Sequence, residues 1–230
     1  MSFGQNLQFL RKLRNDMTQE ELAEKLSVSR QTISKWELDN AYPEMNNLVE
    51  LCKLFSCSMD DLVRGNLNLS DDAFSEIRFE TVESFYCLRY AVISVEPEDD
   101  SIHHVELMAK ELNISKPEII GWDFPFLSQE QINVYNMHGY EAALILKDGK
   151  LIQEKQDKLF YQERQKYMVI TIKEPFTAPF RLIPNAYKIL MTHMKINGIK
   201  YKDSKEIIPC FEKTYKKEGM EYMDVYIAIE

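Results

Sequence analysis

Four closely spaced polar residues could read nucleic acid. Arg30, Gln31, Thr32 and Lys35 would share one side of a short helix, which has no large apolar residue to bury. Glutamine and arginine can each make paired hydrogen bonds to a base edge, and lysine can reach a base or a phosphate. The chemistry predicted for this cluster is hydrogen bonding in the major groove of DNA.

The elements that must position this cluster are two short helices joined by a turn. Thr18 and Glu21 have the spacing of a capping box, which predicts a helix that begins near Gln19. Ser29 is a suitable N-cap for a second helix. The apolar positions that recur at helical spacing across both helices are Leu22, Ala23, Leu26, Ile33 and Trp36. We expect Leu22 and Trp36 to be core residues.

The alternative is a small helical bundle whose charged face is only solvated. The capping box, the small Ala23, the turn and the N-cap agree in register, which favours a DNA-binding helix-turn-helix. The flanking sequence predicts three more helices, over Phe3–Leu13, around Leu48–Phe55 and around Met59–Val63. The first of these has a basic end at Arg11, Lys12 and Arg14. The expected fold of residues 1–65 is an all-α five-helix domain.

On these motifs, residues 1–64 resemble the phage-repressor/Cro-like (Xre-type) helix-turn-helix family. The resemblance implies a base-reading face of Arg30, Gln31, Thr32 and Lys35, and phosphate contacts from Gln19, Asn40 and Tyr42. One segment departs from the family, which usually has Asn-Gly after the second helix where this chain has Leu38, Asp39 and Asn40. Asp39 can adopt the left-handed conformation of a glycine, but it places a negative charge near the DNA backbone.

Composition and charge limit the partners. The chain has 230 residues and 45% hydrophobic content, enough for two cores, and it has no apolar run of membrane-span or signal-peptide length. We therefore expect a soluble cytoplasmic protein with no membrane partner. The four cysteines, which have no CxxC pairing or histidine neighbours at metal-ligand spacing, are Cys52, Cys57, Cys87 and Cys210. We expect buried thiols, no metal and no cofactor.

The net charge of −9 is unevenly distributed. Residues 1–65 carry eight Lys and Arg against ten Asp and Glu, a net charge of −2, and the remainder carries −7. A near-neutral DNA-binding domain of residues 1–65, here called the head, gains little nonspecific affinity for phosphates. Useful operator affinity then needs two heads side by side, so the sequence predicts a homodimer.

The pattern changes after residue 65. Residues 66–77 are polar and turn-rich and are expected to form a linker, with one helical turn near residues 71–77. From Arg78 onward, short β-rich runs alternate with two helical stretches, which indicates an α+β domain over residues 78–230. The run YAVISVEP (Tyr90–Pro97) resembles YMVITIKEP (Tyr167–Pro175), and a helix and two strands are expected after each. The expected fold is therefore two tandem strand-helix-strand-strand units with a ligand groove between them, although coincidence among common strand residues could explain the repeat.

Residues 78–230 resemble the GyrI-like effector-binding domain found in AraC-type and MerR-type bacterial regulators. The match rests on Phe211, Glu212 and Tyr215, then Tyr226, and on the Gly139–Glu141 run. Residues 148–166 are longer and more charged than a minimal connection between two halves. The resemblance implies a glutamate in the pocket, which is Glu212 here.

Glu212 would face the same side of a strand as Cys210 and Thr214, opposite Phe211. An inward carboxylate favours a cationic or hydrogen-bond-donating ligand, because burying it unpaired is costly. Aromatic side chains that could line the walls and attract a cationic or aromatic effector are Tyr86, Trp122, Phe124, Tyr135, Tyr140 and Tyr226. The alternative is a solvated Glu212 among ordinary core aromatics.

An enzyme and a protein-binding module are the rival classes. In a GyrI-like hydrolase, Glu212 with Tyr86 or Trp122 could position a water molecule as a general base does. No nucleophilic triad is recognisable around Ser204 or the histidines. Fusion to a DNA-binding domain favours ligand sensing over either alternative, because the second domain then has something to control. The sequence predicts a ligand-responsive bacterial transcription regulator without catalytic residues, and it leaves the ligand, the operator and the direction of regulation open.

Overall fold

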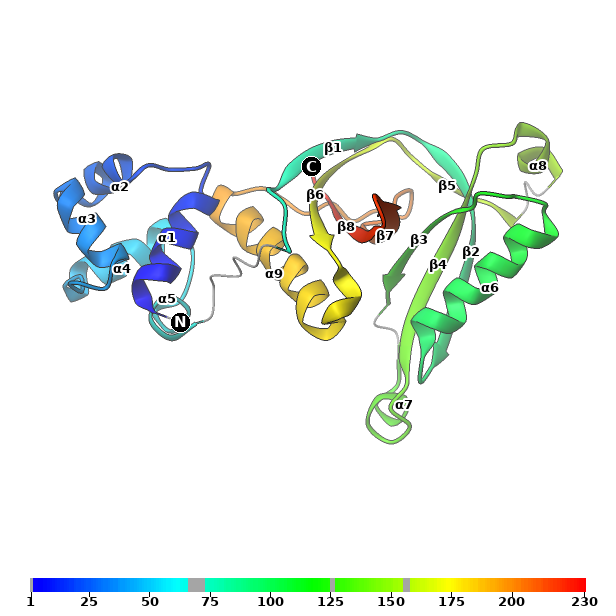
Figure 1. Ribbon diagram of the computed structural model, residues 1–230, viewed down its shortest axis with the longest axis horizontal. Helices are drawn as coiled ribbons and strands as arrows, with labels where there is room; N and C mark the ends of the chain where they lie inside the picture. Colours follow the sequence, from blue (N-terminus) through cyan, green and yellow to red (C-terminus); the bar gives the residue numbers. More distant parts are fainter. Residues whose placement is uncertain (1, 66–72, 125–126, 155–157) are drawn as a thin grey trace. The chain divides into compact units, whose positions relative to one another are not determined.

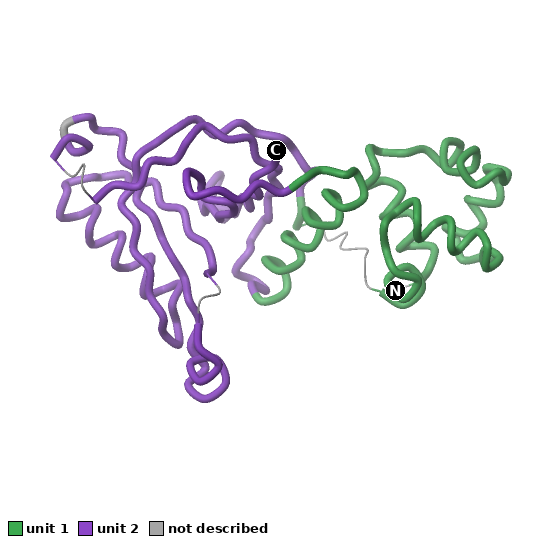
Figure 2. Tube along the Cα trace, turned by 180° about the vertical axis from the view of Figure 1, so that it is seen from behind, with its two compact units in different colours: residues 1–74, 180–200 green, residues 75–179, 201–230 purple. Residues whose placement is uncertain are grey.

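The computed structural model describes residues 2–65, 73–124, 127–154 and 158–230 (Figure 1). Most of the expected linker, including the start of its predicted helical turn, lies outside these residues. The chain forms two compact units (Figure 2). Unit 1 comprises residues 1–74 and 180–200, and unit 2 comprises residues 75–179 and 201–230.

Unit 1 is helical. Its elements are α1 (Phe3–Leu13), α2 (Gln19–Leu26), α3 (Arg30–Glu37), α4 (Met45–Leu54), α5 (Met59–Arg64) and α9 (Pro179–Asn197). Capping boxes at Ser2, Thr18 and Ser58 start α1, α2 and α5, and the Ser29 hydroxyl accepts a hydrogen bond from the Thr32 amide at the start of α3. These local signals explain why the helices begin where they do.

The core of unit 1 brings α9 together with the N-terminal helices. Trp36 of α3 is 3% exposed and Leu22 of α2 is fully buried, so both are core residues as expected. Ile196 of α9 belongs to the same apolar cluster. The Asn197 side-chain amide of α9 donates a hydrogen bond to the Leu13 carbonyl of α1 over 3.1 Å. The last turn of α9 is therefore part of this packing.

Unit 2 is a curled antiparallel sheet with helices. Its strands are β1 (Arg78–Val82), β2 (Phe85–Ser94), β3 (Glu118–Asp123), β4 (His138–Leu146), β5 (Phe160–Gln162), β6 (Gln165–Lys173), β7 (Cys210–Lys217) and β8 (Met220–Ala228). Within the described ranges they form one eight-stranded sheet in the order β1-β6-β8-β7-β3-β4-β2-β5. The expected sequence of a helical region followed by an α+β region is confirmed.

The helical elements of this α+β region are of two kinds. The long helix α6 (Pro97–Glu111) packs on β2 and β4, whereas α7 (Gln129–Asn133), α8 (Gly149–Glu154) and the 3-10 turn η2 (Pro175–Thr177) are short. The apolar spacing predicts a helix over Ile102–Leu112, but α6 begins at Pro97, because proline suits a first helical position and three acidic residues follow in the first turn.

The sheet of unit 2 has two different faces. One, here called the helix face, carries Leu88, Tyr140 and Leu144 and packs against Val105 and Ala109 of α6. The other, here called the aromatic face, carries the cluster of Trp122, Tyr167, Phe211 and Tyr226 together with Ile120. Across the described residues, no helix is long and apolar enough to span a membrane.

Candidate functional sites

The outward side of α3 is polar and open. Arg30, Gln31 and Lys35 are exposed, whereas Thr32 is half-buried and its hydroxyl lies 2.9 Å from the Ser29 hydroxyl. Ile33 and Trp36 occupy the buried side of the same helix. The helix therefore leaves Arg30, Gln31 and Lys35 exposed, whereas the Thr32 hydroxyl contacts the Ser29 hydroxyl at the start of the helix.

A buried ion pair fixes the end of α3 against α1 and α2. The Arg11 guanidinium donates to both Glu37 carboxylate oxygens, over 2.6 and 3.0 Å, and to the Met17 carbonyl over 2.5 Å. Gln19 Nε2 donates to Glu37 Oε2 over 2.9 Å. Arg11 is thus a buried structural residue, although its place at the basic end of α1 gives no sign of this. The same carboxylate holds the half-buried Gln19 at the first position of α2.

The departure at Asp39 has a local structural role. Asp39 has a φ of 57°, the left-handed conformation expected for it, and its carboxylate accepts a hydrogen bond from the Gly4 amide over 2.9 Å. Its negative charge therefore lies at the N-terminus of α1, where it is favourable. Asn40 is exposed, and Tyr42 is 69% exposed with its ring 5.8 Å from that of Phe3.

Glu212 lies on β7, where this strand pairs with β3. It is 6% exposed on β7 and is in register with Gly121 of β3. The Tyr140 hydroxyl donates a hydrogen bond to Glu212 Oε2 over 3.0 Å. A Cβ atom at Gly121 would lie 2.3 Å from that hydroxyl, so glycine leaves room for the pair. Glu212 is therefore a buried carboxylate on the helix face, and the alternative of a solvated edge residue is wrong.

Further carboxylates surround the Tyr140 hydroxyl. Burial, followed by the charges of Glu212 and Glu98, raises the pKa of Tyr140 well above its ordinary value. Burial and the neighbouring Asp123 likewise raise the pKa of Glu98. Desolvation raises the pKa of Asp123 itself, although its side chain keeps access to solvent. The Tyr140 hydroxyl therefore stays protonated beside Glu212, and Glu98 and Asp123 lie near enough to act on it electrostatically.

The other aromatic residues expected at the ligand site do not join this pair. Trp122 is buried in the aromatic face with the Arg89 guanidinium 5.3 Å from its ring centre. Phe124 is half-buried beside Gly139, and Tyr135 is exposed near α7. Tyr86 and Tyr226 line a separate cavity. The seven residues thus lie in several places in unit 2.

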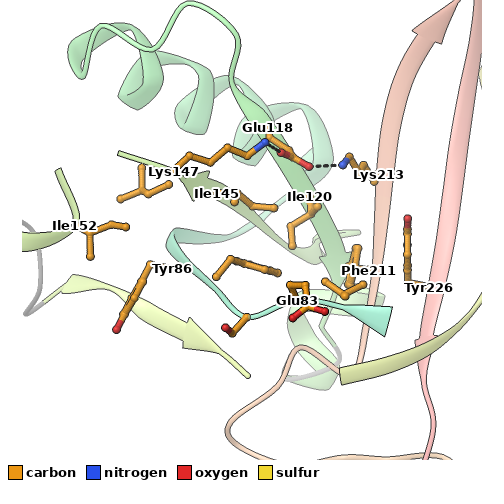
Figure 3. A pocket seen from close by; sticks show the side chains of 14 residues that line it. Glu83, Tyr86, Glu118, Ile120, Ile145, Lys147, Ile152, Phe211, Lys213 and Tyr226 are labelled. Carbon is orange, nitrogen blue, oxygen red and sulfur yellow. Dashed lines mark hydrogen bonds and ion pairs between the residues drawn. The ribbon is translucent and has the colours of Figure 1, made fainter. Parts of the chain in front are cut away.

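That cavity has a volume of about 500 Å³ and opens between the β1–β2 turn and strands β3, β4, β7 and β8 (Figure 3). Lys147 and Lys213 both contact the Glu118 carboxylate at its edge, where Lys147 Nζ lies 2.5 Å from Glu118 Oε2. None of these three residues was predicted from the sequence as part of a site. Strand alternation along β7 places Lys213 on the same face as Phe211 and opposite Glu212. This pattern is the sequence signal that predicts the position of Lys213.

All four cysteines are free thiols, and burial raises the pKa of each. In the ranges that the structure describes, no group of three or more His, Cys, Asp or Glu side chains could hold a metal ion.

Comparison with known proteins assigns the N-terminal helices. A helix-turn-helix family model matches residues 7–62, which confirms the resemblance seen in the sequence for this region. The HTH-type transcriptional activator BcrR of Enterococcus faecalis is 49% identical over 65 residues, or 28% of this chain. The match spans only 31% of the length of BcrR.

Solved structures provide weaker likenesses that extend over more of the chain. The C-terminal domain of EcmrR has 12% identity and a TM-score of 0.45, covering 67% of this chain and 97% of that domain. EcmrR in a complex with DNA has 12% identity and a TM-score of 0.47, covering 93% of this chain and 85% of that one. SAV2435 bound to tetraphenylphosphonium has 11% identity and a TM-score of 0.40, covering 68% of this chain and 94% of that one.

Proposed function

We propose that the chain is a ligand-responsive transcription regulator that binds operator DNA through residues 1–65 and a small molecule through residues 78–230. The observation that carries the proposal is the pairing, in one chain, of an exposed polar recognition helix with a buried Glu212–Tyr140 pair at a strand junction. The first feature suits base edges, and the second suits a cationic ligand.

In this proposal α3 enters the major groove. Arg30, Gln31, Thr32 and Lys35 contact bases, whereas Gln19, Asn40 and Tyr42 contact phosphates. The protein acts as a homodimer, because a head with a net charge of −2 over residues 1–65 gains little affinity from phosphates alone. Its operator would then contain two half-sites about one helical turn apart, or a multiple of that spacing.

The proposed DNA reading can be tested on an operator selected from random duplexes with the full chain. Gln31→Ala should cost roughly 1–3 kcal/mol of binding free energy on that operator and much less on random DNA. Gln8→Ala, the same substitution at an exposed glutamine of α1, is the matched control. Equal losses on both DNAs would remove the base-reading role of Gln31.

We also infer that residues 78–230 are a duplicated GyrI-like unit. The strand order β3-β4-β2 on one side of the β3–β7 junction mirrors β7-β8-β6 on the other, and the long helices α6 and α9 each follow the first strand of their half. This symmetry supports two tandem strand-helix-strand-strand units. Glu212 would then lie at the seam between them, where the ligand is expected to bind.

The effector proposed for this seam is a lipophilic or aromatic cation. The Glu212 carboxylate supplies the negative charge, and the protonated Tyr140 keeps it hydrogen-bonded before the ligand arrives. Other residues in the proposed ligand set are Tyr86, Trp122, Phe124, Tyr135 and Tyr226. The chain passes from unit 2 into residues 180–200 and then returns to unit 2. The last turn of α9, within these residues, packs with α1. In this proposal α9 transmits ligand binding to the DNA-binding helices.

Calorimetry of the full chain with tetraphenylphosphonium tests the effector site. Glu212→Gln keeps the shape and removes the charge, so it should weaken binding by about tenfold or more, whereas Glu106→Gln, an exposed change on α6, should not. Unchanged affinity in Glu212→Gln would refute the charge argument. A GyrI-like hydrolase, the alternative, would instead show ester turnover that is lost in Glu212→Gln while substrate binding is retained.

A further inference from the structure

The cavity of Figure 3 is separate from the Glu212 site. Phe211 and Lys213 line it, and Glu212 lies between them on the opposite side of β7, where it contacts Tyr140. The cavity therefore belongs to the aromatic face, and the effector site proposed above belongs to the helix face. A ligand in the cavity would not contact Glu212, and a ligand at the effector site would not contact Glu118.

The inner wall of the cavity is formed by apolar side chains that pack closely against one another. Ile120, Phe211 and Tyr226 are 1%, 3% and 7% exposed. The rings of Phe211 and Tyr226 stack with centres 4.3 Å apart and planes 13° apart. A volume of about 500 Å³ lies within the usual range for sites that hold small organic ligands. This part of the cavity suits a rigid hydrocarbon body.

The edge of the cavity has more cationic than anionic charge. Lys147 and Lys213 share the single Glu118 carboxylate, as the dashed lines in Figure 3 mark. Partial burial opposes ionisation of Glu118, but the two lysines outweigh it and lower its pKa, so Glu118 is charged at neutral pH. The other acidic lining residue, Glu83, forms an ion pair with Arg164 over 3.0 Å. Among the described residues that line the cavity, one positive charge is therefore not matched by an anion.

We propose that this cavity binds an apolar monocarboxylate. The carboxylate of the ligand lies between Lys147 and Lys213 and supplies the second anion, and its hydrocarbon body packs against Phe211 and Tyr226. Lys147 can adjust to the ligand because its side chain is 78% exposed. Charge-assisted hydrogen bonds to two lysines provide the selectivity for an anion, and the apolar part provides contact area.

Isothermal calorimetry of the full chain with 2-naphthoate tests this proposal, with neutral 2-naphthamide as the matched probe. We expect 2-naphthoate to bind and the amide to bind about tenfold or more weakly. Lys213→Met keeps the aliphatic stem and should weaken 2-naphthoate binding to a similar extent. Lys216→Met, an exposed lysine on the same strand that pairs with Glu221, should leave it unchanged.

Glu118→Gln distinguishes a ligand site from a purely structural ion pair. Removing the competing carboxylate leaves two lysines for the ligand, so 2-naphthoate should bind more tightly in this variant. Glu212→Gln should not alter 2-naphthoate affinity, whatever its effect on the cationic effector. Thermal unfolding of each variant verifies that it is folded. Absent 2-naphthoate binding, equal binding of the amide, no gain in Glu118→Gln, or a loss in Glu212→Gln would each overturn the proposal.

Discussion

Replacing Glu37 by glutamine should destabilise the DNA-binding head strongly. The Glu37 side chain is 3% exposed, and it accepts hydrogen bonds from Arg11 and Gln19. Glutamine has nearly the same shape, but its amide nitrogen would face a donor and the Arg11 charge would be buried without a counter-charge. Breaking one side of a buried ion pair costs about 3–5 kcal/mol. We expect the lower end of that range, because the remaining amide oxygen still accepts one hydrogen bond.

Tryptophan fluorescence during urea unfolding can measure this loss in the full chain. The two tryptophans are Trp36 in unit 1 and Trp122 in unit 2, so a Trp122→Phe background reports on the head alone. The exposed Glu24→Gln is the control. In a double-mutant cycle, Glu37→Gln should cost much less once Arg11→Met has removed the buried cation. A Glu37→Gln loss below about 0.5 kcal/mol, typical of an ordinary surface change, would refute the reasoning.

Three further predictions concern unit 1. Trp36→Ala should lower the free energy of unfolding of unit 1 by about 3–5 kcal/mol, measured by calorimetry of the full chain. Leu38→Ala, a change at an exposed residue, should have little effect. An unchanged melting transition in Trp36→Ala would contradict its assignment to the core. Asp39→Asn keeps an acceptor for the Gly4 amide but removes a charge, so it should tighten operator binding. Loss of the favourable charge at the N-terminus of α1 should lower the melting temperature slightly, and weaker operator binding would contradict the prediction. Burial lowers the pKa of His193 below 6.5, so the folded state favours the neutral imidazole. The contribution of His193 to stability is therefore complete above pH 6.5 and is lost as the pH falls towards the lowered pKa. The free energy of unfolding should depend less steeply on pH in His193→Gln, and an equally steep dependence would contradict this prediction.

Local signals made the helix-turn-helix predictable from sequence. Capping at Thr18 and Ser29 depends on residues three positions apart, so the starts of α2 and α3 follow from the sequence itself. The left-handed conformation of Asp39 is likewise a property of a short polar side chain. Strand alternation correctly separated Glu212 from Phe211, because a period of two needs no knowledge of the neighbouring strands.

Long-range pairings were not predictable in the same way. Arg11 contacts Glu37 from another helix, and Glu118 contacts Lys213 across β3 and β7, so neither pair has a characteristic spacing. The three-residue strand β5 is too short for an alternation pattern to be recognised. Packing of α9 with α1 depends on tertiary contacts of Ile196 and Asn197, whereas the sequence only places that helix between two strand regions. These features arise from register and packing and not from local preference.

The junction of β3 and β7 connects the two proposed ligand sites. Among the described residues, the register between these strands contains one pair, Gly121 with Glu212, whereas β7 and β8 pair along eight positions. Side chains reinforce this short junction on both faces, through Tyr140–Glu212 on the helix face and Lys213–Glu118 on the aromatic face. A cation that competes for Glu212 and a carboxylate that competes for Lys213 would therefore each replace one side-chain link across the same junction.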